Sequence, residues 1–331
     1  MADSINKALI IRFSSVGDVV LSSLLVRAFR SRFPEARIDF AVKQEYADLV
    51  RFNPHISGVK EFPAEGTFAD LKRLRSEIQH EHYDLIVDIH DSLRSRFLSV
   101  GAKHVVRINK RKFARFLLVR FKLNVYSTFG GAPAVALRYL EPVHRFGVTD
   151  DGKGLELFFS ESDETRIREL IQSSGFESNE QFIGVCPSAK HNNKMWLKER
   201  FADAAAALSR QHNRPIVIFG SEEEREHSTA IEQLIMKPDV RVLNLAGKLS
   251  LTETAAMMDY CSVVITNDTG LMHVASARKR NVVAIFGPTV KEFGFFPFGT
   301  NSVVVENKGL YCRPCTHIGL PDCPEGHFKC M

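Results

Sequence analysis

The stretch KALIIRFSSVGDVVLSSLLVRAFRSR, residues 7–32, contains an apolar run, a short polar segment and an amphipathic run. The apolar run at 7–13 predicts a buried strand, and residues 19–32 predict a helix because apolar side chains recur three and four positions apart. Residues 14–18 predict the loop that joins them. A strand that leads directly into a helix is typical of a parallel sheet with helices on both faces.

The same alternation continues along the chain and restarts after a polar linker between residues 147 and 180. The other predicted strands are 37–42, 84–89, 182–187, 215–220, 240–245, 262–266 and 281–286, and the other predicted helices are 68–81, 164–173, 197–211, 252–260 and 269–277. We therefore predict an α/β protein with two domains, residues 1–160 and 161–331. Ligands of open parallel sheets bind beyond the carboxyl ends of the strands, so two sheets that face each other predict a site in the cleft between them.

The composition is that of a globular protein. Of 331 residues, 44% are hydrophobic and 25% are charged, which excludes a disordered tail, a collagen-like repeat and a small disulfide scaffold. The sequence contains no window of 18 consecutive apolar residues, so it predicts no membrane-spanning helix. The start, MADSINKALIIRF, lacks the basic segment and long apolar run of a secretory signal. We expect a cytoplasmic protein.

The net charge of +5 is unevenly distributed, because residues 92–140 contain eleven Lys and Arg residues and no Asp or Glu. Within this basic stretch, residues 109–126 alternate cations with phenylalanine and leucine. Such a segment can lie on an anionic membrane surface or contact a lipid that carries phosphates and acidic sugars. The alternative is an ordinary helix with its apolar side in the core. A nucleic-acid partner is not expected, since no recognition module accompanies the segment.

Several catalytic motifs are absent from the sequence. No G-x-G-x-x-G follows the first strand, which disfavours a nicotinamide dehydrogenase, and no P-loop is present. Zinc-protease, serine-hydrolase and kinase signatures are missing too.

Polar motifs instead follow the predicted strands, and the first is Ser14-Ser15-Val16-Gly17-Asp18. Gly17 allows the backbone to turn tightly. Asp18 can cap the following helix, which local sequence favours, or accept a proton from an acceptor hydroxyl, and the two roles are compatible.

Three further motifs suit a nucleotide. Lys190 and Lys194, in residues 187–196, can contact phosphate oxygens or can be ordinary surface lysines. In Asn267-Asp268-Thr269-Gly270-Leu271-Met272-His273, backbone N–H groups at a helix start can bind a diphosphate. Asp268 can cap that helix, and His273 fits a structural histidine. Gly287-Pro288-Thr289 follows the next strand, and one carboxylate of Glu222-Glu223-Glu224 can bind a ribose diol.

The order S-S-x-G-D, P-S-x5-K-x-W, D-T-G-x-x-H-x-A and G-P-T resembles the heptosyltransferases, glycosyltransferase family 9. This resemblance covers most of the chain and implies a GT-B fold, in which two Rossmann-like domains face each other across a cleft. The N-terminal domain would bind the acceptor and the C-terminal domain the donor. The implied reaction is an inverting transfer of heptose from ADP-heptose to a lipopolysaccharide inner-core acceptor at the cytosolic face of the inner membrane. No metal or other cofactor is implied for catalysis.

The resemblance also implies roles for the residues at matching positions. Asp18 would be the general base and Lys194 would neutralise the leaving diphosphate. The implied donor-binding residues are Ser188, Ala189, Lys190, Lys194, Glu222 at the ribose, Leu249 at the adenine, Asp268, Thr269, Gly270 and His273, and those on the acceptor side are Ser14, Ser15, Gly17 and Arg94. The alternatives are another nucleotide sugar or a protein acceptor with the same mechanism, or a non-catalytic nucleotide-sugar-binding or anion-binding module.

Four cysteines, Cys312, Cys315, Cys323 and Cys330, lie in the last twenty residues. The first pair has the C-x2-C spacing of a metal knuckle and the second pair does not, so a structural zinc or iron site stays open. No catalytic metal is expected. Family members usually continue with a helix that crosses back to the first domain, whereas this sequence ends at Met331.

Overall fold

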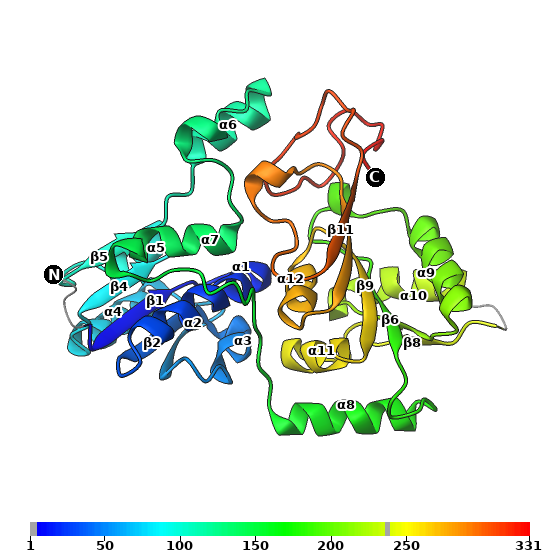
Figure 1. The fold of residues 1–331 in the computed structure, drawn as a ribbon, viewed down its shortest axis with the longest axis horizontal. Coiled ribbons are helices and arrows are strands. Elements are labelled where there is room, and N and C mark those ends of the chain that lie inside the picture. The colour runs from blue at the N-terminus through cyan, green and yellow to red at the C-terminus, as the bar shows by residue number, and fades with distance from the viewer. Residues whose placement is uncertain (1–4, 236–238) are drawn as a thin grey trace. The chain divides into compact units, whose positions relative to one another are not determined.

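The computed structural model describes residues 5–235 and 239–331, which divide into two compact units (Figure 1). The first unit extends to Lys110 and includes Val135–Phe158, and the second comprises Arg111–Ala134 and Phe159–Met331. Each unit is a parallel β-sheet flanked by helices, so the predicted α/β class is confirmed.

The sheet of the first unit has the order β3-β2-β1-β4-β5, and every neighbouring pair is parallel. Its strands are β1 (Lys7–Ile11), β2 (Arg37–Lys43), β3 (Gly58–Phe62), β4 (Leu85–Asp88) and β5 (Val105–Arg107). Its α-helices are α1 (Val16–Leu21), α2 (Ser23–Arg32), α3 (Asp48–Arg51), α4 (Phe68–His80), α5 (Leu93–Leu98) and α7 (Val135–Leu140), with 3-10 turns at Gln44–Tyr46 and Glu141–Phe146.

The second unit is built in the same way around a sheet of order β11-β10-β9-β6-β7-β8, again all parallel. Its strands are β6 (Phe182–Cys186), β7 (Ile216–Ile218), β8 (Val242–Asn244), β9 (Cys261–Asn267), β10 (Asn281–Phe286) and β11 (Ser302–Glu306). Its α-helices are α6 (Lys112–Phe121), α8 (Glu161–Ser173), α9 (Lys198–His212), α10 (Arg225–Ile235), α11 (Leu251–Met258) and α12 (Gly270–Ala277), and its 3-10 turns are Tyr126–Phe129, Asn192–Lys194, Glu222–Glu224 and Lys291–Phe293.

Helix α4 illustrates how local sequence and burial act together. A capping box starts it: the Thr67 hydroxyl accepts from the Asp70 N–H, and the Asp70 carboxylate accepts from the Thr67 N–H. Leu71, Leu74 and Ile78 then recur at helical spacing and are all buried in one core cluster with residues of β1. The helix is therefore fixed both by its N-terminus and by its apolar stripe.

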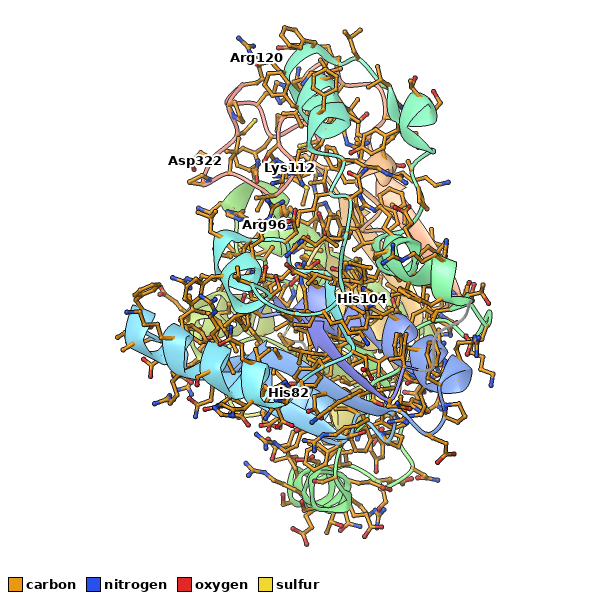
Figure 2. The ribbon with its side chains drawn as sticks, turned by 90° about the vertical axis from the view of Figure 1, so that its left-hand side faces the viewer. His82, Arg96, His104, Lys112, Arg120 and Asp322 are labelled. Carbon is orange, nitrogen blue, oxygen red and sulfur yellow. The ribbon has the colours of Figure 1, made fainter. Side chains whose placement is uncertain are left out.

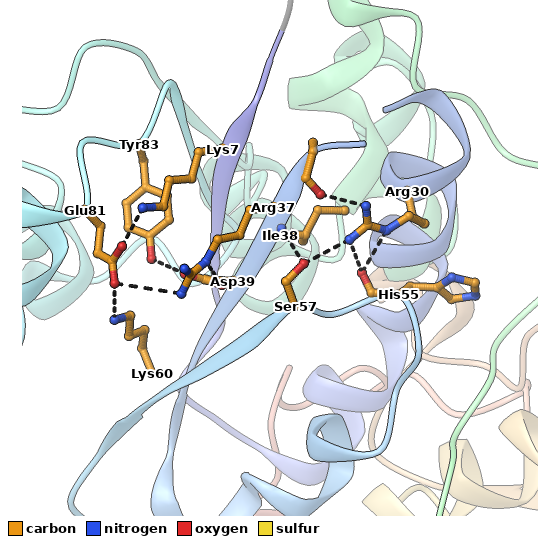
Figure 3. Close-up of polar contacts among 11 residues, drawn as sticks. Lys7, Arg30, Arg37, Ile38, Asp39, His55, Ser57, Lys60, Glu81 and Tyr83 are labelled. Carbon is orange, nitrogen blue, oxygen red and sulfur yellow. Dashed lines mark hydrogen bonds and ion pairs between the residues drawn. The ribbon is translucent and has the colours of Figure 1, made fainter. Parts of the chain in front are cut away.

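The amino end of the first sheet carries a structural ion-pair network (Figure 3). Glu81, just before β4, accepts from Lys60 at 2.7 Å and from Lys7 at the start of β1. Nearby, the Tyr83 hydroxyl donates to the buried carboxylate of Asp39 at 2.6 Å. The bonds that Glu81 accepts, from Lys60 as the larger effect and then from Lys7, lower its pKa from 4.5 to about 2. The network links residues of β1, β2 and β3 at the end of the sheet opposite to the predicted site.

We expect Glu81→Gln to reduce the free energy of unfolding by about 1 kcal/mol at neutral pH, because two lysines lose their carboxylate. The folded-state pKa of Glu81 lies below its unfolded value, so its contribution is present above pH 4.5 and is lost as the pH falls toward 2. Urea unfolding at decreasing pH should show wild type and variant converging. Glu65→Gln, at an exposed glutamate of the same unit, should match wild type throughout. A constant gap between wild type and Glu81→Gln would contradict the assignment.

The predicted helix over 19–32 was wrong in detail. The structure has two helices, because Ser22 separates α1 from α2 and its hydroxyl donates to the carbonyl of Val19 at 2.6 Å. The first helix also begins earlier, at Val16. Gly17 is therefore a buried residue within α1 rather than the tight turn expected from the sequence.

The basic segment at 109–126 contains a helix, α6, which folds with the second unit. Ala114 and Leu118 are buried in a cluster with Tyr126 and Phe293. The Lys122 ammonium, at the C-cap, donates to the carbonyl of Pro314 at 2.6 Å. These contacts explain why Arg111–Ala134 departs from the predicted division of the chain at residue 160. They also show one apolar side of the helix in a core, as the alternative interpretation expected.

Candidate active site

In the first unit, a carboxylate is held at the carboxyl end of the sheet. Asp18 is the third residue of α1, where the helix dipole favours a negative charge. Arg12, directly after β1, forms an ion pair with one carboxylate oxygen of Asp18 and donates to the carbonyl of Ile89 at 2.9 Å. The hydroxyl of Tyr139, on α7, donates to the other oxygen at 2.8 Å. Both oxygens of Asp18 are thus fixed by groups from other elements.

This arrangement overturns the expectation that Asp18 caps its helix. Ser15 occupies the N-cap position of α1, and no capping bond from its side chain is found among the described residues. Asp18 lies one turn further along and points its carboxylate to Arg12 and Tyr139 instead. The competing contacts are long-range in sequence, so local capping preference does not decide its role.

Burial controls the protonation of the groups around Asp18. Burial, the largest cause, and the Asp18 carboxylate hold the pKa of Tyr139 well above its usual value although the Arg12 charge lowers it, so this phenol stays a hydrogen-bond donor. Burial is the largest single effect on Arg12 and opposes its charge, yet Asp18, Tyr139 and Asp88 together raise the pKa of Arg12. Burial and then Arg12 lower the pKa of His90 to about 3, so His90 is neutral at physiological pH. Tyr139 and Arg12 therefore both remain partners of the Asp18 carboxylate.

The other predicted acceptor-side residues lie at the same edge of the first unit. Ser14 is half-buried and Ser15 is exposed, and both precede α1. Arg94 is an exposed residue in the first turn of α5, and its charge contributes to the low pKa of His90. A hydroxyl pair, a carboxylate and a guanidinium therefore share one strand-end surface.

In the second unit, Asn267 ties together two of the predicted motifs. This last residue of β9 donates from its side-chain amide to the carbonyl of Pro187 at 2.6 Å, and its amide oxygen accepts from the N–H of Trp196 at 3.1 Å. Pro187 and Trp196 are the two ends of the loop that contains Lys190 and Lys194. The loop is consequently anchored at both ends to the strand that leads into α12.

A buried ion pair joins the same two motifs. The Lys194 ammonium lies 2.7 Å from a carboxylate oxygen of Asp268, and the Thr289 hydroxyl donates to that oxygen at 2.7 Å. Side-chain exposure is 13% for Lys194 and 9% for Asp268. The expectation that Asp268 caps α12 was wrong, because Thr269 holds the N-cap position. No capping bond from the Thr269 side chain is found in the described part of the chain.

Ser188 has a buried hydroxyl that finds no hydrogen-bond partner within residues 5–235 and 239–331. Ala189, beside it, is buried, and Lys190 is exposed. An unpaired buried hydroxyl costs about 1–3 kcal/mol unless a ligand or water satisfies it. Ser188 therefore suits a position where a polar ligand binds next to the loop.

The predicted ribose and adenine residues follow the next two strands of the sheet. Glu222 begins the turn after β7 and pairs with Arg225. A Cβ atom at Gly247, in the loop after β8, would lie only 2.3 Å from the Glu222 carboxylate, and its φ of +72° also favours glycine. Leu249 is half-buried two residues later. The donor-side residues thus line consecutive strand ends from β10 to β8.

His273 lies within α12 and is buried, with its ring centroid 6.4 Å from that of Phe295. This position agrees with a structural histidine. That His273 contacts the donor remains a prediction.

Sequence reasoning missed the residues that support the two clusters. Tyr139 is 121 positions from Asp18, and Arg12 reads as part of an apolar strand. Arg313, in the C-terminal segment, is almost fully buried and donates to the carbonyls of Gly287 and Thr289. In the sequence, the one feature that could have drawn attention to Arg313 was its position between Cys312 and Cys315. The C-terminal segment therefore positions the loop that carries the Thr289 hydroxyl.

The four C-terminal cysteines are free thiols, and the Sγ atom of Cys312 lies 3.7 Å from Nε2 of His327. Across the residues that the structure describes, no three His, Cys, Asp or Glu side chains are arranged to hold a metal ion. The same residues include no helix that is long and apolar enough to cross a bilayer.

Known proteins share this sequence pattern and architecture. The model of glycosyltransferase family 9 (heptosyltransferase) matches residues 71–323. Lipooligosaccharide heptosyltransferase 2 of Haemophilus influenzae is 28% identical over 297 residues, which cover 86% of this chain and 84% of that protein.

Two solved structures have the same fold. A glycosyl transferase family 9 protein of Veillonella parvula superposes with a TM-score of 0.78 at 21% identity, over 92% of this chain and 87% of that one. The ADP-heptose lipopolysaccharide heptosyltransferase II of E. coli superposes with a TM-score of 0.73 at 22% identity, over 92% and 91% of the two chains. The predicted GT-B architecture of two Rossmann-like domains is confirmed. The chain is therefore a glycosyltransferase and belongs to glycosyltransferase family 9, the heptosyltransferases.

Proposed function

We propose that this enzyme transfers a heptosyl group from ADP-heptose to the inner core of lipopolysaccharide. Family membership supports heptosyl transfer, and the names of the relatives point to this donor and acceptor. The observation that carries the proposal is the Lys194–Asp268 pair before α12, together with the unpaired Ser188 hydroxyl after the neighbouring strand β6. It offers a cation, helix N–H groups and a hydroxyl donor to one anionic ligand.

The diphosphate of the donor would bind at this cluster. Thr269 and Gly270 stand at the N-terminus of α12, where backbone N–H groups and the helix dipole favour phosphate. Lys194 supplies a full positive charge to the bridging or terminal oxygens, and Asp268 keeps its ammonium in place. Because negative charge grows on the diphosphate as the sugar leaves, these fixed groups stabilise the transition state more than the bound substrate.

The nucleoside would extend along the neighbouring strand ends. Glu222 follows β7 and can accept from both hydroxyls of a ribose, while Leu249, after β8, can contact the flat face of adenine. The Glu222 carboxylate pairs with the exposed Arg225. When a ribose binds, Glu222 would exchange this ionic contact for two hydrogen bonds.

Asp18 would act as the general base. Its carboxylate accepts the proton of the acceptor hydroxyl while the oxygen attacks the anomeric carbon of the sugar. The new carbon–oxygen bond forms as the bond from that carbon to the diphosphate breaks, and ADP carries away the electron pair. A single displacement inverts the anomeric configuration. Lys194 and the α12 N–H groups neutralise the departing charge, and no metal takes part in this proposed step.

The proposed acceptor places the reaction at a membrane. Lipopolysaccharide precursors are lipids, so an enzyme that receives its donor in the cytoplasm would meet the acceptor at the cytosolic face of the inner membrane. Nucleic acid has no part in this reaction.

A panel of nucleotide sugars tests the proposal. The purified protein is incubated with each sugar and a truncated lipopolysaccharide core, and the released nucleoside diphosphate is measured. We expect ADP release from ADP-heptose together with an acceptor that gains one heptose by mass spectrometry. Turnover of another nucleotide sugar alone would overturn the donor assignment, a protein product would overturn the acceptor, and binding without turnover throughout would favour a non-catalytic module.

Tyr139→Phe tests whether this tyrosine positions the base. The change removes one hydrogen bond to an ionised carboxylate, and we expect kcat to fall about tenfold with little change in KM for the donor. Because the ionised carboxylate has lost a donor, the acid limb of the kcat–pH profile should also move to higher pH.

Tyr83→Phe is the matched control, since it removes another tyrosine–aspartate bond in the same unit at the opposite end of the sheet. It should lower thermal stability and leave both kcat and the pH profile of the folded enzyme unchanged. A Tyr139→Phe enzyme with a wild-type pH profile would show that the tyrosine serves stability alone.

A further inference from the structure

Helix α6 exposes an aromatic face that its own unit does not cover. Phe113, Phe116 and Phe121 have exposed fractions of 62%, 55% and 56%, and the rings of Phe116 and Phe121 contact each other at 5.9 Å between centroids. Leu123 continues the patch just beyond the helix. Exposing several large apolar side chains next to one another is unfavourable in water and marks a binding surface.

The opposite side of α6 fixes its orientation. Ala114 and Leu118, one turn apart, are buried against Tyr126 and Phe293, and Lys122 is bonded to the C-terminal segment. Phe113, Phe116 and Arg120 recur at helical spacing on the side turned away from Ala114 and Leu118. Phe121, the last residue of the helix, is exposed and its ring contacts that of Phe116. The aromatic face therefore points outward from a helix that is already anchored.

The charges next to the patch are of one sign. Lys112 and Arg120 are exposed on α6, and Figure 2 shows them toward its two ends. No Asp or Glu occurs anywhere between residues 92 and 140. Just after the helix, the side-chain amide of Asn124 donates to the Glu292 carboxylate at 3.0 Å. Apolar rings flanked by cations fit an anionic bilayer surface, with the rings among the acyl chains and the cations at the headgroups.

We propose that α6 is an interfacial helix that docks this enzyme on anionic lipid, with Phe113, Phe116 and Phe121 inserted below the headgroups. The inference deepens the proposed function, since a lipid acceptor has to be reached at a bilayer. Vesicle binding requires no turnover, so it can succeed or fail independently of the proposed reaction.

Vesicle sedimentation of the full chain tests the proposal. Vesicles contain either phosphatidylglycerol with phosphatidylethanolamine or phosphatidylcholine alone. We expect wild-type protein to bind the anionic vesicles at least about tenfold more strongly, and the difference to shrink as salt screens the charges. The triple variant F113S, F116S, F121S should have a partition coefficient between water and anionic vesicles that is at least about tenfold lower than that of wild type. Lys112→Gln with Arg120→Gln should lower binding only to the anionic vesicles.

Helix α4 provides matched controls, because it exposes Phe68 to 60% and carries Lys72 beside it. Phe68→Ser and Lys72→Gln should bind vesicles as wild type does. Equal binding of the triple serine variant and wild type, or equal binding to neutral vesicles, would overturn the proposal. The triple variant should keep its melting temperature and its kcat with a water-soluble deacylated acceptor. A loss of that kcat would assign the aromatic face to the active site instead of the bilayer.

Discussion

Asp18→Asn is expected to reduce kcat by about a thousandfold or more while ADP binds with unchanged affinity. The amide keeps the shape of the side chain and can still accept from Tyr139, but it cannot take a proton from the acceptor hydroxyl. General-base catalysis contributes about a hundredfold to ten-thousandfold, and losing the ion pair to Arg12 adds to the effect. Release of ADP measures kcat, and calorimetry measures ADP binding on the same preparation.

Asp48→Asn is the control for this variant. It makes the same chemical change on α3 of the same unit, where Asp48 is 59% exposed and pairs with Arg51. Its kcat and ADP affinity should equal those of wild type. An Asp18→Asn enzyme that turns over at more than about a tenth of the wild-type rate would remove Asp18 as the base.

Lys194→Ala is expected to weaken ADP binding by about 10- to 100-fold and to reduce kcat further. A charge-assisted contact to phosphate contributes about 1.5–3 kcal/mol, and each 1.4 kcal/mol is tenfold in affinity. The variant also leaves the buried Asp268 carboxylate without its cation, next to the place where the diphosphate would bind. Repulsion between these anions adds to the loss, which calorimetry with ADP measures.

The double variant Lys194→Ala, Asp268→Asn separates the two effects. It removes the repulsive carboxylate, so it should bind ADP more tightly than Lys194→Ala alone and more weakly than wild type. Lys198→Ala, at an exposed lysine on α9, is the control and should bind as wild type does. Wild-type ADP affinity in Lys194→Ala would contradict the diphosphate assignment.

The sequence predicted the positions of most strands well because apolar runs mark buried central strands. The strands β1, β2, β4, β6, β7, β8, β9 and β10 were all expected at nearly their observed positions, whereas β3, β5 and β11 were not. These three are edge strands of their sheets, although β8, the fourth edge strand, was predicted. In β11, half-buried and exposed residues alternate, so the strand lacks the continuous apolar run that identifies a buried neighbour.

Some residues of the candidate site could likewise be predicted from the sequence and others could not. Lys194, Asp268 and Thr289 belong to motifs that end adjacent parallel strands, so their proximity follows from the fold. Tyr139 could not be paired with Asp18 in advance, because it reaches the site from a helix 121 positions away. The preference of aspartate for N-caps misled at both Asp18 and Asp268, since ion pairs with Arg12 and Lys194 decide their orientation.

A crystal structure of the protein with ADP would show whether the Lys194 loop and the N-terminus of α12 bind the diphosphate. We expect the diphosphate within hydrogen-bonding distance of the Lys194 ammonium, the Ser188 hydroxyl and the N–H groups of Thr269 and Gly270, with the ribose at Glu222. Density for the nucleotide at any other surface, with the Lys194–Asp268 pair undisturbed and the Ser188 hydroxyl still unpaired, would contradict it.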